Sequence, residues 1–422
     1  MTKSAKGIGA ALRGGSLALV VVAHAHLVAS SPADGDLLRI APRSIRLIFS
    51  EPVEAALSTI VVVSARDSLG IPVRADSTDA RVLLGDPPPL RPAEYRIDWR
   101  TVSADGHPVE GSYRFRVLPP DGSGDSVPAL GRLDSLARPH GGTRPTHAAP
   151  NLAAGVSAAL RGLGMFSLLV LAGWLMQIVA LRADPPHGAM RAALLLAVGS
   201  TVFLAAHLGT WLWHVTPADR APDLAAALRT TPGRVEAVRV ALALLCLGAI
   251  GLARRPGIAV GLAVAAVLVS GATGHSAGIV PRWSIPIKAL HLIAVATWLG
   301  GVAWLALAAL GSQPFRESVF RVSRMALGAV LVVGLTGVAQ AALFLPGPDA
   351  LLSSAYGRLV LAKAAGLAGL VAFGAYNRRC LLPALAAGAK PGALRGSTRR
   401  ELMLMLAVSL VAGVLAYVPP PA

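Results

Sequence analysis

Residues 287–310 read IKALHLIAVATWLGGVAWLALAAL, a run with one charged side chain, Lys288, near its start. About 20 consecutive apolar residues are enough for a helix to cross the hydrocarbon core of a bilayer. Similar runs recur along the second part of the chain, near 152–180, 190–214, 236–252, 258–274, 324–345, 358–377 and 401–418. We therefore predict an all-α transmembrane bundle of eight helices over residues 151–422.

The composition of the chain agrees with a membrane protein. Of its 422 residues, 54% are hydrophobic and 14% charged, and the mean hydropathy is +0.61. The net charge is +17, but segment 26–118 holds 11 Arg against 12 Asp and Glu, whereas 151–422 holds 22 Lys and Arg against 7 Asp and Glu. The excess therefore lies beside the apolar helices, where it sets topology and meets lipid headgroups. This distribution argues against nucleic-acid binding, and two cysteines imply no disulfide framework.

The basic residues between the apolar runs give the bundle an orientation. With residues 26–118 exported, thirteen Lys and Arg fall in inner loops and seven in outer loops, the latter including Arg239 and Lys288. This arrangement satisfies the positive-inside rule. We expect a multi-pass protein of the bacterial inner (plasma) membrane, with its N-terminal domain in the periplasm or extracytoplasmic space.

Residues 26–118 have the pattern of a small β-domain. Stretches rich in β-branched and aromatic residues are separated by Pro, Gly and Asp turns, at 44–49, 58–63, 95–99 and 111–117. This rhythm over about 90 residues is typical of an antiparallel sandwich. Residues 119–150 are rich in Pro and Gly and lack periodicity, which predicts a flexible tether.

Residues 1–25 have the features of a secretory signal peptide. Basic residues precede the apolar stretch LALVVVA at 17–23, and Ala23-His24-Ala25 fits the small-x-small cleavage pattern. Cleavage after Ala25 would leave His26 with both a free α-amine and an imidazole. These two nitrogens can chelate one metal ion, and Cu(II) prefers such tetragonal nitrogen and oxygen donors.

A second group of donors lies in the segment SADGHPVEG at 103–111. Asp105 and His107 flank Gly106, so a turn there can direct a carboxylate and an imidazole the same way. Together with His26 they make a set of amine, two imidazoles and a carboxylate, which suits Cu(II). After cleavage the exported segment contains neither Cys nor Met, which argues against a Cu(I) site there.

Histidines in apolar runs are candidate functional residues, because ionisable groups at membrane depth are costly. His207 and His214 lie on one predicted helix face with Trp211 between them. His275 ends the run at 258–274, and His291 lies near the start of the run at 287–310. In the expected topology these histidines lie toward the outer half of the membrane, and Trp211, Trp213 and Trp283 are expected as interfacial anchors.

The exported segment resembles the CopC family of periplasmic copper-binding domains. The resemblance rests on HL at 26–27, SP at 31–32 with DG at 34–35, FSEPVE at 49–54, SADGH at 103–107 and GSYRF at 111–115. It implies a cupredoxin-like or Ig-like sandwich of seven strands. It also implies Cu(II) ligands from the His26 amine and imidazole, Asp105 and His107. Glu51 matches a family position as a hydrogen-bond acceptor behind the ligands.

Residues 151–420 resemble the CopD family of copper-resistance membrane domains. The matching stretches are GHSA at 274–277, HL at 291–292 with WLGG at 298–301, and YGRL at 356–359, followed by Lys363, NRR at 377–379 and Pro383. The resemblance implies a membrane copper site at His275 and His291, with His207 and His214 as further candidates. The order of the two domains resembles that of fused copper-uptake proteins.

We therefore expect a protein that captures Cu(II) outside the membrane and passes it to the helical domain for import and copper homeostasis. It would have no catalytic residues, and its partners would be copper ions, the bilayer and an external copper chaperone or reductase. Two alternatives stay open. A copper-dependent oxidase or monooxygenase could use the His26 site, and a haem-binding membrane electron carrier could use paired membrane histidines.

Overall fold

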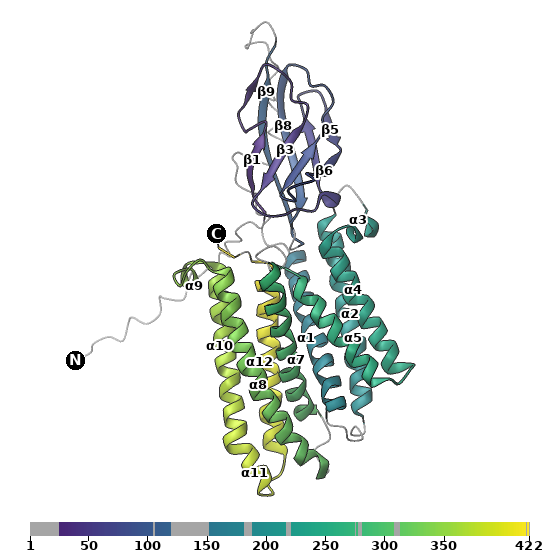
Figure 1. The fold of residues 1–422 in the computed structure, drawn as a ribbon, viewed down its shortest axis with the longest axis vertical. Helices are drawn as coiled ribbons and strands as arrows, with labels where there is room; N and C mark the ends of the chain where they lie inside the picture. The colour runs from purple at the N-terminus through teal and green to yellow at the C-terminus, as the bar shows by residue number, and fades with distance from the viewer. Residues whose placement is uncertain are drawn as a thin grey trace, which may run out of the picture.

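The computed structural model describes residues 25–103, 106–119, 152–180, 188–216, 221–274, 276, 281–307, 313–418 and 420–421. In this part of the chain, a β-domain stands on one end of a helical domain (Figure 1). The first long helix begins, and the last one ends, at the end that faces the β-domain. The predicted order, an all-β domain followed by an all-α domain, is observed.

The β-domain is a sandwich of two sheets. One sheet has the order β1 (Leu27–Ser31), β3 (Ile45–Phe49), β7 (Val82–Gly85) and β6 (Val73–Ala75). The other has the order β2 (Leu37–Leu38), β9 (Pro108–Val117), β8 (Ala93–Val102), β4 (Thr59–Val63) and β5 (Ser68–Ile71). Alternate residues of β8 point inward, and its Trp99 ring lies edge-on to Phe49 of the facing sheet, with centroids 5.2 Å apart. The period-2 pattern that predicted these strands therefore fills the core.

The four predicted strands correspond to β3, β4, β8 and β9, but the expected count of seven is wrong. The described residues contain nine strands, several of them only two to four residues long. Pro72 explains part of the difference, because it separates β5 from β6 and the two belong to different sheets. A proline cannot donate to a ladder, so the chain changes sheet there.

Each predicted apolar run contains a helix. The long helices are α1 (Leu152–Ala180), α2 (Ala189–Val215), α4 (Thr231–Gly251), α5 (Pro256–Val269), α7 (Pro281–Leu307), α8 (Gln313–Phe344), α10 (Ala355–Tyr376) and α12 (Gly392–Leu415). Short elements lie between the long helices: α3 (Leu224–Leu228), η4 (Ser270–Ala272), α9 (Ala350–Ser353), the π-helical η5 (Asn377–Leu381) and α11 (Leu382–Ala386). A further short helix, η1 (Ala55–Leu57), lies in the β-domain between β3 and β4.

The prediction of eight membrane-crossing helices is not confirmed. In the described ranges, five helical segments are long and apolar enough to cross a membrane, those based on α1, α2, α7, α8 and α10. The apolar segment Pro256–Ala272 is shorter. The helix α4 carries three charged residues, Arg234, Glu236 and Arg239, and α12 begins with a basic stretch. These charges lower the apolar character of both helices.

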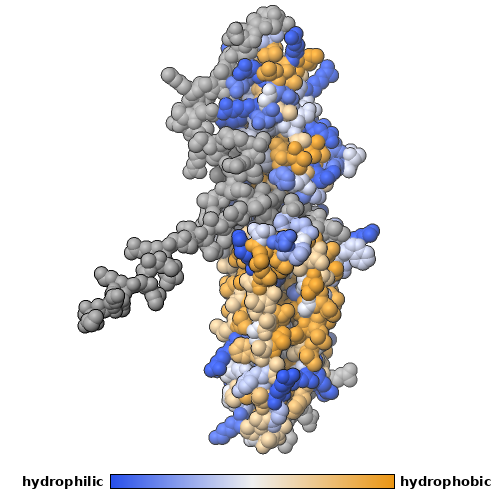
Figure 2. Space-filling model, turned by 90° about the vertical axis from the view of Figure 1, so that its left-hand side faces the viewer, coloured by the Kyte–Doolittle hydropathy of each residue, from blue (hydrophilic) through white to orange (hydrophobic). Residues whose placement is uncertain are grey.

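The helix α1 lies at the centre of the helical domain, packed against α2, α5, α7 and α12. Small residues allow the closest approach: a Cβ at Gly173 would lie 1.8 Å from the carbonyl oxygen of Ala296 in α7. Such contacts between small residues are typical of helix pairs in membranes. The face of the helical domain shown in Figure 2 is largely hydrophobic. Large apolar side chains exposed on the helices include Leu195, Leu335 and Val338. A lateral apolar surface of this kind suits contact with lipid.

Candidate functional site

The turn between β8 and β9 carries His107 and is held by local hydrogen bonds. The Ser103 amide and hydroxyl both donate to the carbonyl oxygen of His107, at 2.9 and 3.1 Å. Gly106 has a φ of +93°, and its amide donates to the Ser103 carbonyl at 2.8 Å. Glycine adopts this conformation readily and other residues rarely do. The turn predicted at Gly106 is therefore present, and it returns the chain into β9 at His107.

This turn contacts the helical domain directly. Trp211 of α2 donates a hydrogen bond from its indole Nε1 to the carbonyl oxygen of Gly106, at 2.7 Å. A Cβ at residue 106 would lie 3.0 Å from that nitrogen, so the close approach also favours glycine. Trp211 is 5% exposed, whereas Trp213 is 71% exposed. The expectation that Trp211 is an interfacial anchor is therefore wrong, because its ring is buried at the domain contact.

Apolar packing surrounds that hydrogen bond. Val102 at the end of β8 forms one buried cluster with Trp211, Val215 and Ala227 of the helical domain. Leu57 of the β-domain packs against the same cluster. Burial of apolar area is the dominant favourable contribution to such contacts, so the cluster stabilises the docked arrangement.

Two polar contacts complete the junction between the domains. Arg100 donates from Nη2 to the backbone carbonyl of His214, at 2.9 Å. The amide of Thr231, at the start of α4, donates to Oε1 of Glu54, at 3.0 Å. Burial at this junction raises the pKa of Glu54 above its ordinary value, although the Thr231 amide and Arg234 favour the ionised form. Glu54 is therefore the acidic group of the β-domain that contacts the start of α4.

His26 lies at the same end of the β-domain as the turn. Its backbone nitrogen donates to Oγ of Ser50 at 3.1 Å, and its carbonyl oxygen accepts from the Ser50 amide at 2.9 Å. A few residues further along, Val53 forms a β-bridge with Ser103. The His26 side chain is exposed, and Glu51 beside it is partly buried. The segment that begins β1 and the turn that carries His107 therefore share one end of the sandwich, the end that faces the helices (Figure 1).

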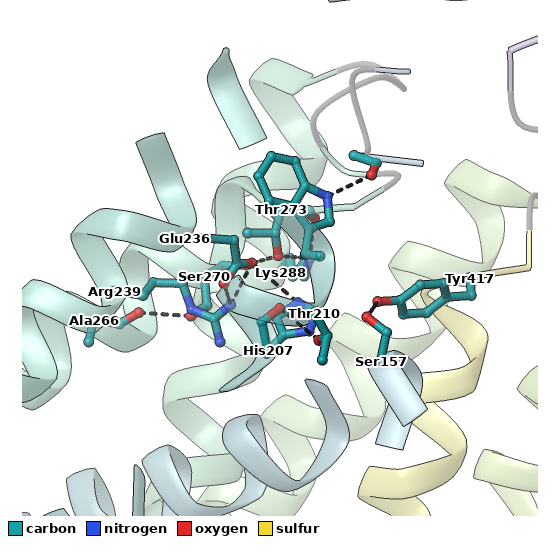
Figure 3. A network of polar contacts seen from close by, with 12 residues as sticks. Ser157, His207, Thr210, Glu236, Arg239, Ala266, Ser270, Thr273, Lys288 and Tyr417 are labelled. Atoms are coloured by element: carbon teal, nitrogen blue, oxygen red, sulfur yellow. Dashed lines mark hydrogen bonds and ion pairs between the residues drawn. The ribbon is translucent and has the colours of Figure 1, made fainter. Parts of the chain in front are cut away.

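From His107, ring and hydroxyl contacts lead into the helical domain. The His107 side chain is 6% exposed, and its ring lies edge-on to the Tyr417 ring with centroids 4.4 Å apart. The Tyr417 hydroxyl is hydrogen-bonded to Oγ of Ser157 in α1, at 2.7 Å. Ser157 lies close to His207 of α2 (Figure 3). Tyr417 and Ser157 therefore lie between His107 of the β-domain and His207 of the bundle.

His207 belongs to a buried polar cluster between α2 and α4. Its Nε2 lies 3.9 Å from Oε1 of Glu236, and Nη1 of Arg239 donates to both Glu236 oxygens, at 2.8 and 2.7 Å (Figure 3). All three side chains are at most 5% exposed. Within the described residues, Nδ1 of His207 is buried without a hydrogen-bond partner. Glu236 is therefore paired with Arg239 and lies beside the His207 ring.

Glu236 was missed by the sequence analysis, and Arg239 was wrongly assigned to an outer loop. The cause is the start of α4. Thr230 caps this helix by accepting from the Gly233 amide, and Pro232 occupies its first turn, so the helix begins at Thr231 rather than near 236. Lys288 was misplaced in the same way, because α7 begins at Pro281. The capping residue and the early prolines are the signals that could have revealed both starts.

His291 occupies a different place, on α7 against α8. Its Nδ1 lies 2.8 Å from Oγ1 of Thr336, and that hydroxyl donates its single proton to the carbonyl oxygen of Val332 at 2.6 Å. The hydroxyl must therefore accept from His291, which places the ring proton on Nδ1 and leaves the lone pair on Nε2. A histidine that donates one N–H and offers the other nitrogen is typical of metal ligands.

Two predicted ligands, Asp105 and His275, lie outside the described residues. Within the described ranges, no three His, Cys, Asp or Glu side chains gather in a way that could hold a metal ion. The described candidates are thus distributed over three places: His26 and His107 at the end of the sandwich, His207 and His214 on α2, and His291 on α7.

Comparisons with known proteins divide the chain in the same way as its fold. Residues 27–118 match the CopC domain, and residues 317–415 match Copper resistance protein D, CopD. This chain is a CopC–CopD fusion. The CopC match covers the whole sandwich, while the CopD match covers α8 to α12 and leaves His207 and His291 outside it.

Relatives match both the fusion and its first domain. The copper transport protein CutJ of Bacillus subtilis is 28% identical over 426 residues, covering 94% of this chain and 75% of that protein. Protein YobA of Escherichia coli K12 is 36% identical over 102 residues, covering 23% of this chain and 81% of YobA. The crystal structure of CopC from Methylosinus trichosporium OB3b is 33% identical, covers 23% of this chain and 95% of that chain, and has a TM-score of 0.22.

The predicted fusion of a CopC and a CopD domain is confirmed by these matches. The CopC part is a copper-binding domain. The related proteins are described as copper transport and copper resistance proteins, not as enzymes. The apolar helices of the CopD part fit a multi-pass membrane protein.

Proposed function

We propose that this CopC–CopD fusion captures Cu(II) outside the plasma membrane and hands copper to its own helical domain for import. The Cu(II) ligands would be His26, after cleavage behind Ala25, together with Asp105 and His107. The observation that carries the proposal is the docking of the His107 turn onto α2 through the Trp211–Gly106 hydrogen bond. Because the ligand-bearing turn already rests on the helices, delivery would not need the β-domain to travel on a tether.

The receiving groups would be histidines near the docked end of the bundle. His207 lies close to Ser157, which is bonded to the tyrosine packed against His107. His291 would be a further ligand because its lone pair is on Nε2, and His275 would join it as the family resemblance implies. His214 supports the junction through its backbone carbonyl. In this scheme copper passes first to the α2 histidine and then deeper into the CopD domain.

The proposal includes a membrane orientation. Eight crossings, with α4, α5 and α12 included, would return the chain to the side on which it began, in agreement with α1 beginning and α12 ending beside the β-domain. The opposite end carries the basic loops with Arg254, Arg255, Arg378 and Arg379. The positive-inside rule would place that end in the cytoplasm and the CopC domain outside.

Cellular copper content under copper limitation tests the function, with and without this protein. The Trp211→Phe variant keeps an aromatic ring but loses the donor to Gly106, and loss of one hydrogen bond of about 1 kcal/mol would lower the equilibrium constant for docking about fivefold. We expect lower copper accumulation with unchanged Cu(II) binding by the CopC domain. Trp213→Phe on the same helix is the matched control, because that side chain is exposed. Equal accumulation by Trp211→Phe and the unsubstituted protein would contradict transfer through the docked turn.

A further inference from the structure

The helical domain contains a partly open cavity whose lining carries several basic side chains. This cavity of about 200 Å³ lies between α1, α7, α8, α10 and α12. Polar and ionisable members of its lining include Arg161, Lys288, His291, Tyr356, Lys363 and Ser409. Lys288 and Tyr356 lie near the starts of α7 and α10, so the cavity is in the half of the bundle nearest the β-domain.

The described lining residues of this cavity include no Asp or Glu. Lys288 donates through Nζ to the carbonyl oxygen of Thr273, which is a neutral acceptor. Lys363 lies in the interior of α10 and, within the described part of the chain, has neither an ion-pair partner nor a hydrogen-bond acceptor. Arg161 lies over the Tyr417 ring, with its Cζ 5.8 Å from the ring centroid. Three cationic side chains therefore share the cavity without a carboxylate on its wall.

The nearest buried carboxylate does not supply the missing charge. Glu236 influences Arg161 and Lys288 electrostatically, but both of its oxygens accept hydrogen bonds from Arg239. Unpaired charges inside a membrane domain are costly and are normally compensated by a partner. An anion in the cavity would compensate the charges of Arg161, Lys288 and Lys363 more directly than Glu236 does.

We propose that this cavity binds an oxyanion of the phosphate class. A guanidinium presents a planar fork of N–H donors that matches two oxygens of such an anion, and ammonium groups add charged donors around it. Hydroxyl groups of Tyr356 and Ser409 are present on the same lining. An oxyanion supplies the negative charge that the described lining lacks, whereas the Ser409 hydroxyl already donates to the carbonyl oxygen of Met405.

Two sources share this chemistry, a free phosphate ion and the phosphodiester headgroup of an anionic lipid. A neighbouring cavity of about 280 Å³ has His291, Tyr356 and Lys363 in common with the first, and its wall is otherwise mainly apolar. An acyl chain could occupy that second space while the headgroup lies at Lys363. The experiment therefore needs one arm for each source.

The full chain is purified and placed in nanodiscs of phosphatidylcholine, then titrated with inorganic phosphate by calorimetry. In the second arm, the chain is exchanged into nanodiscs containing phosphatidylglycerol, and retained lipid is counted by native mass spectrometry. We expect saturable binding in one of the two arms. Lys363→Met should weaken this binding about tenfold or more, which is the effect expected from the loss of one hydrogen bond to a charged group. Lys390→Met is the matched control because Lys390 is exposed at the opposite end of the bundle.

Lys363→Arg keeps the charge and should retain binding, and thermal unfolding of each variant shows whether it is folded. If Lys363→Met is unfolded, Arg161→Gln replaces it, with the same expected loss. The proposal is overturned if neither phosphate nor phosphatidylglycerol binds, or if binding is the same in Lys363→Met as in Lys390→Met. These measurements use no copper, so their outcome is independent of the proposed copper transfer.

Discussion

The ring of His107 lies edge-on to the ring of Tyr417, with centroids 4.4 Å apart and an interplanar angle of 71°. This contact joins the turn of the CopC domain to the chain just beyond α12, 310 positions later in the sequence. It places a predicted Cu(II) ligand against the end of the CopD domain. A substitution of either residue should therefore change the packing of the other ring.

Tyr417→Ala should loosen the docked turn. An aromatic pair of this kind contributes about 0.5–1.5 kcal/mol beyond area burial, so we expect faster hydrogen exchange at residues 106–110, measured by mass spectrometry on the full chain. Tyr417→Phe keeps the ring and loses the hydroxyl with its bond to Ser157, so it should leave exchange in the turn near that of the unsubstituted protein. Equal protection in Tyr417→Ala would show that the ring contact does not hold the turn.

Docking of the two domains should strengthen as the pH falls. Burial at the junction raises the pKa of Glu54 above its ordinary value of 4.5. A group whose pKa is raised in the docked state favours docking below its free pKa, and this contribution is lost as the pH rises through the raised value. We expect protection of the 50–58 segment from exchange to be greater near pH 4.5 than at pH 7.5.

Glu54→Gln tests the origin of that pH dependence. Glutamine keeps an oxygen that accepts from the Thr231 amide but cannot ionise. The difference in exchange protection of segment 50–58 between pH 4.5 and pH 7.5 should therefore become smaller. Glu110→Gln is the control, because Glu110 is exposed on β9. An unchanged pH dependence in Glu54→Gln would assign the effect to another group.

Adding one glycine before His26 in the processed protein should lower Cu(II) affinity strongly. The extra residue moves the α-amine away from the imidazole, so the two nitrogens no longer close one chelate. Competition titrations with a Cu(II) chelator measure the change. Ser50→Ala, which removes the hydroxyl 3.1 Å from the His26 nitrogen, should have a smaller effect. Unchanged affinity after the glycine insertion would rule out the N-terminal chelate.

Thr336→Val should weaken copper binding by the helical domain. The Thr336 hydroxyl holds the proton of His291 on Nδ1, and loss of such a supporting group typically lowers metal affinity about 10–100-fold. The measurement is the amount of copper bound per protein molecule. Each variant also carries His107→Ala, which removes the copper site of the β-domain. Thr297→Val is the control, since that hydroxyl donates to Ile293 within its own helix. Equal copper content in both variants would make His291 a structural residue.

The parts of this fold that sequence predicts are those with one dominant local signal. The alternation of Tyr95, Ile97 and Trp99 predicts β8 correctly, and the apolar runs predict where helices lie. Short strands such as Val73–Ala75 carry too few residues for a period to appear. Predicted helix starts are displaced where charged residues lie in the first turns of an otherwise apolar helix, as Arg239 does in α4.

For the candidate site as well, the sequence predicts the local structure but not the contact between the domains. The glycine of the Asp-Gly-His motif predicts a turn, and that turn is present at Gly106 with its positive φ. Its docking partner could not be predicted, because Trp211 lies 105 residues away and its own pattern is that of a lipid anchor. Contacts between domains depend on the shapes of both surfaces, and the periodicity of a local sequence does not predict them.

The turn at Gly106 has an evolutionary consequence. One short loop both presents His107 and holds the two domains together through Trp211. A substitution at position 106 that adds a Cβ would press on the indole, so it would survive only with a smaller residue at position 211. Among fusions of this kind, positions 106 and 211 should therefore vary together, whereas free-standing CopC proteins, which lack the helix, should show no such linkage at their glycine.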